Sequence, residues 1–344
     1  MKIHIIFSLF LLTCILSLFI SSNNIAQDNE KIKSFQEQVD NIIKREKSNL
    51  KQATAIKTIN QTKHIYKFGL PEAKGIKLFE SIIDNNGKYV QQFVVYDSDS
   101  AIVSKETYQY DENGNKTDLI LYNSDGNVER KEIYKYDNKN LVDFMIYNND
   151  GELEKKISYK YTGNLLTEEV AYKSSGDPIE KFVYNYSSGL IVSKIKYNGD
   201  GELQEKTIFN YSNNNQLLNE TIYESDSSIV NKFIYSYDDH NNLVEKAELN
   251  SKGEVLNKQV FAYNSKNKLA QESRYEDGSS PIKKMIYSYN NLGLLSEKTE
   301  FNEDGKQVSK FQYTYDKAGR EKTEISINLL NEPEYELRYN YQIK

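Results

Sequence analysis

The chain has few of the residues on which catalysis and covalent cross-linking depend. Its 344 residues include one cysteine, three histidines, four prolines and no tryptophan. The single cysteine, Cys14, lies in an N-terminal leader, so the mature chain forms no disulfide and depends on packing and strand pairing. Phosphate-binding glycine motifs, nucleophile elbows and zinc-protease motifs are also missing. We therefore expect a protein that is not an enzyme, with no catalytic residues, no metal and no cofactor.

An excess of basic charge is missing as well. The net charge is −6, and acidic and basic residues are interspersed along the chain. Nucleic-acid binding needs a basic stripe that neutralises phosphates, so we expect no nucleic-acid partner. The abundant residues are instead aromatic, with 28 tyrosines and 14 phenylalanines. Because each aromatic ring removes a large apolar area from water, these rings must supply much of the buried surface.

The first 26 residues have the composition of an export signal. A basic Lys2 precedes the apolar stretch 5–20, and the small polar segment 21–26 follows. We predict cleavage after Ala26, which leaves no membrane span in the mature chain. An uncleaved anchor and a lipid attached at Cys14 are the alternatives. The protein is expected to be exported, to a periplasmic, outer-membrane-associated or extracellular location.

A Tyr-x-Tyr motif recurs ten times with a period of 25 or 26 residues. Its second tyrosines are Tyr110, Tyr136, Tyr161, Tyr186, Tyr211, Tyr237, Tyr263, Tyr289, Tyr315 and Tyr341. A fixed period of this length predicts a repeat array in which each unit packs on its neighbours. Each unit reads as two strands joined by turns rich in Asn, Asp and Gly, such as 123–126. We predict an all-β, long twisted antiparallel meander of about ten two-strand repeats. It is expected to curl or spiral, with an open sheet as the alternative.

The N-terminal part of the mature chain has a different pattern. Ile32, Phe35, Val39 and Ile43 recur at helical spacing. We predict four parts: the signal peptide 1–26, a helical cap 27–65, a linker 66–76 and the repeat domain 77–344. The cap is expected to cover the first strand edge, because an exposed edge invites pairing with other chains. A helix that binds a partner or a second copy is the alternative.

Two further columns recur through the repeats. Aromatic residues six positions after a leucine column are expected to share the face of those leucines; they are Tyr122, Tyr147, Tyr172, Tyr197, Tyr223, Tyr275 and Phe301. Regular lysines such as Lys131 and Lys156 are expected to pair across strands with acids such as Asp118 and Asp143. A polyanion-binding stripe is the alternative for these lysines. Hairpin chemistry accounts for the Asn-x-Asp-Gly turns, for which calcium binding is the alternative.

Two segments resemble the Tyr-Asp-x-x-Gly signature of YD repeats from bacterial Rhs-type proteins. They are Tyr110-Asp111-Glu112-Asn113-Gly114-Asn115 and Tyr315-Asp316-Lys317-Ala318-Gly319-Arg320. The resemblance covers residues 77–344. It implies spiralling β-sheet walls and an exported protein, and in that family the repeats enclose a toxin or serve in surface contact and carbohydrate binding.

The functional expectation is a non-enzymatic exported repeat protein that binds a glycan or a surface protein through its sheet. The alternative is a structural or assembly component of a cell-envelope complex. Binding is expected where the repeat is irregular. The turn 225–228 lacks glycine and Leu249 replaces a column tyrosine. The candidate ligand-binding residues are therefore Tyr223, Asp226 and Tyr275.

Overall fold

The computed structural model describes residues 33–34, 36–41, 43, 56–276 and 280–343. The predicted signal peptide 1–26, with Cys14, lies outside these residues. Apart from helical residues between 33 and 43, called the inner helix below, the described elements are strands. They are β1 Ile56–Lys67, β2 Leu70–Pro71, β3 Ile76–Ile83, β4 Val90–Tyr96, β5 Ile102–Tyr110, β6 Lys116–Tyr122, β7 Val128–Asp137, β8 Asn140–Tyr147, β9 Leu153–Thr162, β10 Leu165–Lys173, β11 Pro178–Ser187, β12 Leu190–Asn198, β13 Leu203–Tyr211, β14 Leu217–Glu224, β15 Ile229–Tyr237, β16 Leu243–Asn250, β17 Val255–Tyr263, β18 Leu269–Glu276, β19 Pro281–Tyr289, β20 Leu295–Asn302, β21 Gln307–Tyr315, β22 Glu321–Ile327 and β23 Pro333–Ile343.

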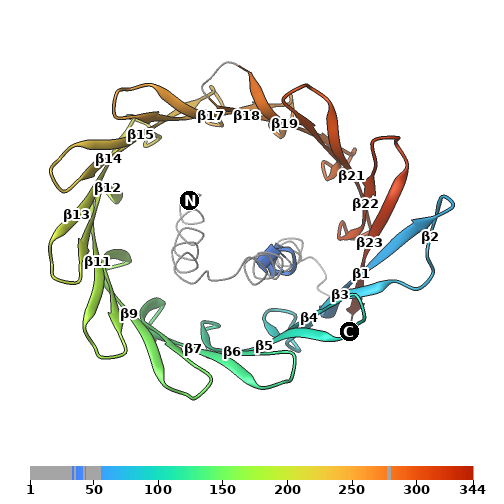
Figure 1. The fold of residues 1–344 in the computed structure, drawn as a ribbon, viewed down its shortest axis with the longest axis horizontal. Helices are drawn as coiled ribbons and strands as arrows, with labels where there is room; N and C mark the ends of the chain where they lie inside the picture. The colour runs from blue at the N-terminus through green and yellow to red at the C-terminus, as the bar shows by residue number, and fades with distance from the viewer. Residues whose placement is uncertain (1–32, 35, 42, 44–55, 277–279, 344) are drawn as a thin grey trace.

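The strands form one antiparallel meander that closes on itself (Figure 1). From β3 to β23 each strand pairs with its neighbours in the chain, and β1 pairs with both β3 and β23. Only β2 stands outside this ring of 22 strands, as a short hairpin on β1. At 4.8 Å between strands, the ring has a circumference of about 105 Å, or a diameter of about 34 Å before tilt. The all-β meander is confirmed, and the open-sheet alternative is wrong.

Closure depends on β1, which occupies the place of a missing second strand. Among the described residues the last Tyr-x-Tyr strand is β23, with Tyr339 and Tyr341, and no second strand of the same repeat follows it there. β1 fills that place, with Gln61 opposite Tyr339 and Ile59 opposite Tyr341. Part of the predicted helical cap 27–65 is therefore strand, and the predicted linker 66–76 contains the β1–β2 hairpin. Side-chain periodicity did not reveal β1 because it lacks the Tyr-x-Tyr motif.

The inner helix lies inside the ring (Figure 1). Val39 is 1% exposed and Ile43 6% exposed, and both pack with Ile59, Phe79 and Phe93 of the wall. Because β1 has a neighbour on each side, no strand edge is left for the helix to cover. The predicted edge-capping role is therefore wrong, and the helix instead buries its apolar stripe against the inner wall.

Every pair of neighbouring strands in the ring contains a register shift. In the β13–β14 pair, for example, Asn210 faces Asn219 but Tyr211 faces Leu217, so Leu218 is an extra residue. An extra residue bends its strand and increases the local twist. One bulge per pair therefore supplies the curvature that a closed ring needs.

In seven repeats the second tyrosine of the motif bonds to the backbone beside a bulge of the preceding repeat. The hydroxyl of Tyr237 donates to the backbone carbonyl of Leu217, twenty residues earlier, at 3.0 Å. The same bond recurs for other repeats, at 2.6 to 3.0 Å: Tyr110, Tyr186, Tyr263, Tyr289, Tyr315 and Tyr341. These tyrosines thus satisfy carbonyls beside the bulges, where the ladder is interrupted.

The predicted turn chemistry is confirmed. Asn123 Oδ1 accepts backbone N–H bonds from Asp125 at 3.1 Å and Asn127 at 2.9 Å. Gly126 has a φ of 79°, in the left-handed region that glycine enters without a steric cost. The same arrangement is present at Asn302 and Gly305, where φ is 70°. Local hydrogen bonding therefore accounts for the recurring Asn and Gly.

We predict that Tyr237→Phe destabilises the closed sheet. The substitution keeps the aromatic side chain but leaves the Leu217 carbonyl without the hydroxyl donor. We expect a loss of about 1 kcal/mol in the free energy of unfolding. Urea unfolding should detect it as a lower midpoint, and Tyr223→Phe on the outer face is the control. Equal midpoints for the wild type and Tyr237→Phe would contradict the anchoring role.

Candidate functional site

The bulges decide which side chains face the interior. In β8, Leu141 pairs with Tyr136, Val142 is the extra residue, and Tyr147 pairs with Lys131. The extra residue reverses the alternation, so Leu141 lies on the inner face and Tyr147 on the outer face. The leucine and aromatic columns were predicted to share a face, and this prediction is wrong.

The outer face carries the predicted lysine–acid pairs. Lys131 lies 3.3 Å from Asp118, Lys156 3.0 Å from Asp143, and Lys310 2.9 Å from Glu297. The lysines also lie over rings of the outer aromatic column, such as Lys258 over Tyr275 at 5.0 Å. Such exposed pairs contribute a few tenths of a kcal/mol each. The acid and the aromatic ring that contact these lysines are therefore both part of the sheet.

The three predicted binding residues do not come together. Tyr223 ends near the rim in β14, where it pairs with Lys206 and Ile229. Asp226 lies in the following turn, where its Oδ1 accepts the N–H of Ser228 at 2.8 Å. Its bonds to Ser228 lower the pKa of the Asp226 carboxyl. Tyr275 lies four strands further along, about 19 Å away. These residues form no common site.

The inner face carries a different aromatic column. It consists of the first ring of each motif, and these residues are called the inner aromatic column below: Tyr108, Tyr134, Tyr159, Tyr184, Phe209, Tyr235, Phe261, Tyr287, Tyr313 and Tyr339. Contacts with the inner helix identify this face, because Gln36 bonds to the Tyr108 hydroxyl at 3.2 Å and Gln38 to that of Tyr339 at 3.0 Å. The column runs around the whole interior.

Charged residues of alternating sign lie directly opposite seven of these rings. From β10 to β22 the residues are Glu169, Lys194, Glu220, Lys246, Glu272, Lys298 and Glu324, called the alternating ring below. Each is paired across the strands with a ring of the inner aromatic column. One residue per repeat places neighbouring charges about 9.6 Å apart along the wall. The sign alternates at every step.

Hydrogen bonds connect the rings to the carboxylates. Tyr184 donates to Glu169 at 3.3 Å and Tyr287 donates to Glu272 at 3.4 Å. Tyr235 donates to Glu220 in the same way. Each of these tyrosines bonds to the acid that precedes it and pairs with the lysine that follows it. Tyrosine, glutamate and lysine thus form polar groups that recur along the wall, with Phe209 and Phe261 between them.

The lysines lie over aromatic faces. Lys194 Nζ lies 4.3 Å from the centre of the Phe182 ring. Lys246 Nζ lies 5.0 Å from Phe233 and 5.6 Å from Tyr235. Such cation–π contacts hold a long side chain in place while its ammonium retains hydrogen-bonding capacity.

Two carboxyls of the alternating ring have perturbed acidity. Burial raises the pKa of Glu169, although the Tyr184 hydroxyl and the Lys194 ammonium oppose the shift. Burial likewise raises the pKa of Glu324, opposed by Lys298 and Tyr313. The wall is therefore less polar than open water at these points, which strengthens hydrogen bonds made there.

Amides extend this polar surface in the middle of the arc. Asn231 donates to Glu248 at 2.7 Å, and Asn257 donates to the other oxygen of the same carboxylate at 2.5 Å. Both asparagines and Glu248 share the inner face with Phe233. Half-buried rings, carboxylates, ammonium groups and amides therefore line β11 to β22.

The opposite side of the interior differs, because the inner helix covers it. Gln36 donates to Glu106 at 2.5 Å, beside Tyr108. Lys116 lies 4.3 Å from the Tyr134 ring, and burial lowers its pKa. Contacts within the protein occupy these groups. We therefore place the candidate binding surface on the inner wall from β11 to β22.

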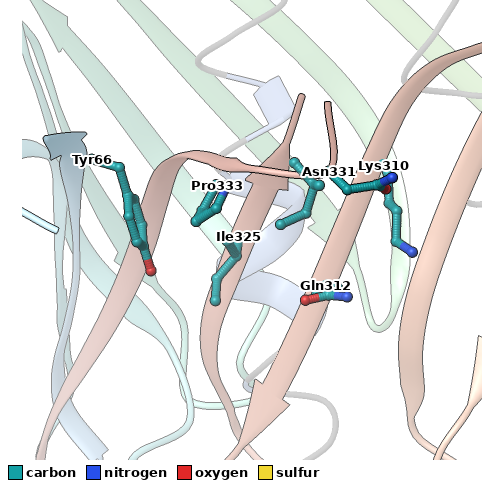
Figure 2. Close-up of a pocket in the computed structure, with 7 residues that line it drawn as sticks. Tyr66, Lys310, Gln312, Ile325, Asn331 and Pro333 are labelled. Carbon is teal, nitrogen blue, oxygen red and sulfur yellow. The ribbon is translucent and has the colours of Figure 1, made fainter. Parts of the chain in front are cut away.

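A hollow of about 300 Å³ lies on the outer wall near the closure of the ring (Figure 2). Tyr66, Gln312, Ile325 and Pro333 line it, together with Lys310, which pairs with Glu297. It is shallow and open, with two amides, Gln312 and Asn331, and no unpaired charge to orient a ligand, so it is a weaker candidate than the inner wall.

The two described histidines, His64 and His240, make hydrogen bonds within the fold. His64 Nδ1 lies 2.7 Å from the Glu72 carbonyl and Nε2 lies 3.0 Å from Thr62 Oγ1. His240 is an exposed turn residue whose N–H donates to Asp238 at 2.9 Å. Within the described residues, no group of three or more His, Cys, Asp or Glu side chains could hold a metal.

A protein-family model described as "Uncharacterised protein" matches residues 35–208 and again residues 175–283. The two overlapping matches together cover more than half of the chain. No curated protein matches it.

Similar solved structures include the Tc holotoxin pore of Photorhabdus luminescens, at 10% identity and a TM-score of 0.30. This chain is covered to 82% in that match but spans only 18% of the holotoxin chain. A porin-like protein from Bacteroides uniformis is 10% identical over 83% of this chain and 98% of its own, with a TM-score of 0.30. Another from Bacteroides vulgatus is 10% identical over 84% and 99%, with a TM-score of 0.25. Because all three TM-scores lie below 0.5, these likenesses carry no argument about function.

The alternating ring was missed in the sequence although its signal is visible there. Six of its seven members stand three residues after the leucine column, as Glu220 follows Leu217, and Glu324 has the same place after Glu321. Only the neighbouring acids two residues after each leucine, such as Glu245, were assigned to a column. The bulge after the leucine places the third residue, and not the second, on the inner face.

We predict that Glu169→Gln changes how stability depends on pH. The folded pKa of Glu169 is raised above 4.5, so the folded chain binds more protons than the unfolded chain above that pH. Its contribution to stability therefore falls as pH rises through this window, whereas glutamine does not titrate. Urea unfolding at pH 4.5 and about pH 7 should show a smaller fall for Glu169→Gln than for the wild type. A difference between the two proteins that stays constant with pH would contradict the raised pKa.

Proposed function

The chain belongs to a family of uncharacterised proteins, and we propose that it is an exported, non-enzymatic protein that binds a glycan. The binding surface is the inner wall from β11 to β22. The observation that carries the proposal is the inner aromatic column, with each ring from β9 to β21 paired with a charge of the alternating ring.

Sugar recognition needs both apolar faces and hydrogen-bonding groups. The C–H face of a pyranose ring packs on an aromatic face, while its hydroxyls donate to carboxylates and accept from ammonium and amide groups. Phe233, Tyr235, Glu248 and Asn257 place these groups side by side. Neutral hydroxyls suit a wall whose charges compensate one another from repeat to repeat.

The repetition of the site favours a polymer over a single small molecule. Each repeat presents one ring and one charge, about 9.6 Å from the next. This spacing is close to the length of a disaccharide unit in an extended polysaccharide. Once one unit of a polymer is bound, the next unit is held at a high effective concentration near the next repeat, so that weak contacts combine into a higher affinity.

Export is supported by the predicted signal peptide 1–26. We also propose a distant relation to YD-repeat proteins, on the basis of segments 110–115 and 315–320. In the part of the chain that the structure describes, no helix is long and apolar enough to cross a bilayer. A periplasmic, outer-membrane-associated or extracellular location accords with a glycan ligand.

We predict that Tyr235→Ala weakens glycan binding. Removing one aromatic anchor should cost on the order of 1–2 kcal/mol, which is about tenfold in Kd. Isothermal titration against soluble neutral and acidic oligosaccharides should first find a ligand of the wild type and then compare the variant with it. Circular dichroism shows whether the variant is folded.

The control uses the outer face. Tyr223→Ala and Tyr275→Ala remove rings of the same size from the opposite side of the wall, so the affinity should not change. Loss of affinity in these variants, with Tyr235→Ala unaffected, would move the site to the outer face. A folded wild type that binds none of the oligosaccharides would refute glycan binding by this wall.

A further inference from the structure

Exposed apolar side chains gather at one end of the ring. This end, called the apolar rim below, consists of the turns that lead from each second strand to the next first strand, such as β14 to β15, of the first two residues of those first strands, and of the β1–β2 hairpin. Of the sixteen exposed large apolar side chains in the described chain, thirteen lie there. The other three are Leu218, Leu292 and Ile343. The two ends of the closed sheet therefore differ in how many apolar side chains they expose.

The opposite end is polar and its turns bond to one another. Asn140 donates to the Gly163 carbonyl of the next turn at 3.1 Å, and Gln216 donates to Asn241 at 3.0 Å. These bonds satisfy polar groups of neighbouring turns within the protein.

The apolar rim is most continuous between β15 and β2. Val230, Leu256, Ile282 and Val308 occupy the same position in successive repeats, and Leu330 and Phe68 continue the series, with Phe68 fully exposed. These six residues are called the apolar arc below. Their exposed fractions in the four strands range from 37% to 46%. The four strand members are about 9.6 Å apart along the wall, since each repeat contributes two strands.

The fold does not require apolar residues at this position. Val230, Leu256, Ile282 and Val308 are each the extra residue of a bulge. The same bulge position holds a glutamate in β7 and β9 and glutamine in β13. Polar residues therefore satisfy the local geometry, and exposed aliphatic residues there need another reason.

The turns beside the apolar arc are acidic. Glu224, Asp226, Glu254, Glu303 and Glu332 are exposed in them, against two exposed lysines, Lys252 and Lys306, of which Lys306 pairs with Asp304. This charge disfavours contact with an anionic membrane or with the same rim of a second copy, because like charges would meet. It favours a partner that presents cations on each side of an apolar stripe.

We propose that the apolar arc is a docking surface for a protein partner that presents a cationic amphipathic helix. Residues seven apart on a helix are about 10.5 Å apart, close to the spacing of the arc. A helix lying along two or three successive repeats, over which the rim curves little, thus places one apolar side chain on each of them, with Lys or Arg of its flanks beside the acidic turns. This surface is separate from the inner wall and goes beyond glycan binding.

The test measures binding of three synthetic helical peptides to the purified full chain. One has a leucine stripe flanked by lysine, the second has the same stripe flanked by glutamate, and the third has lysine without the stripe. We expect the first to bind most tightly and to weaken with added salt. Leu256→Gln and Ile282→Gln, which copy Gln204 of β13, should each weaken it about tenfold. Leu292→Gln, at the opposite end, should leave the affinity unchanged.

Three results would overturn the proposal. One is equal binding of the lysine-flanked and glutamate-flanked peptides, and another is equal loss in Leu256→Gln and Leu292→Gln. The third is binding of phosphatidylcholine vesicles, or self-association in sedimentation, that depends on Leu256 and Ile282 while the peptide does not bind. Val308→Gln provides an independent variant should either of the others fail to fold.

Discussion

The insertion of β1 between β3 and β23 is the interaction on which the rest of the structure depends. A meander of two-strand repeats has two exposed edges, and each edge presents unpaired backbone groups. In the described chain β23 pairs with β22 on one edge, and β1, from the N-terminal side, pairs with its other edge and with β3. Closure turns an extended sheet into an enclosed wall, because it is only then that the two faces become an interior and an exterior.

The bulges give those faces their separate chemistry. One extra residue per strand pair curves the sheet, and it also reverses the alternation within a strand, as between Leu141 and Tyr147. The exterior then carries lysine–acid pairs and rings covered by lysine, which keep the wall soluble. The interior carries the inner aromatic column and the alternating ring, and the inner helix covers only part of it. The bulges therefore support both the closure of the ring and the separation of the lysine–acid outer face from the aromatic and charged inner face.

Much of the fold follows from the sequence, since the period fixes strands and turns locally. The turn at Asn123, the prolines at strand starts such as Pro178, and the Lys131–Asp118 pair need only neighbouring residues to form. Closure could not be predicted in this way, because β1 lacks the repeat motif and its pairing joins residues 280 positions apart. The faces were misassigned for a related reason: a bulge shifts the phase by one residue without changing the repeat length. Tyr223 and Tyr275 were therefore expected on the face of the leucine column, whereas they lie on the outer face, and Glu220 and Lys246 were overlooked.

The most direct test of this account is a disulfide across the closure. Asn60 of β1 and Asn340 of β23 pair directly, and their side chains are 3.2 Å apart. In a Cys14→Ser background, cysteines at these two positions should oxidise within one molecule, because paired strand positions meet the distance that a disulfide needs. Cysteines at Asn60 and Asn185, on strands far apart in the ring, should not. Rapid intramolecular cross-linking of the first pair alone is the predicted result. Equal reactivity of both pairs, or cross-links only between molecules, would show that the sheet is open.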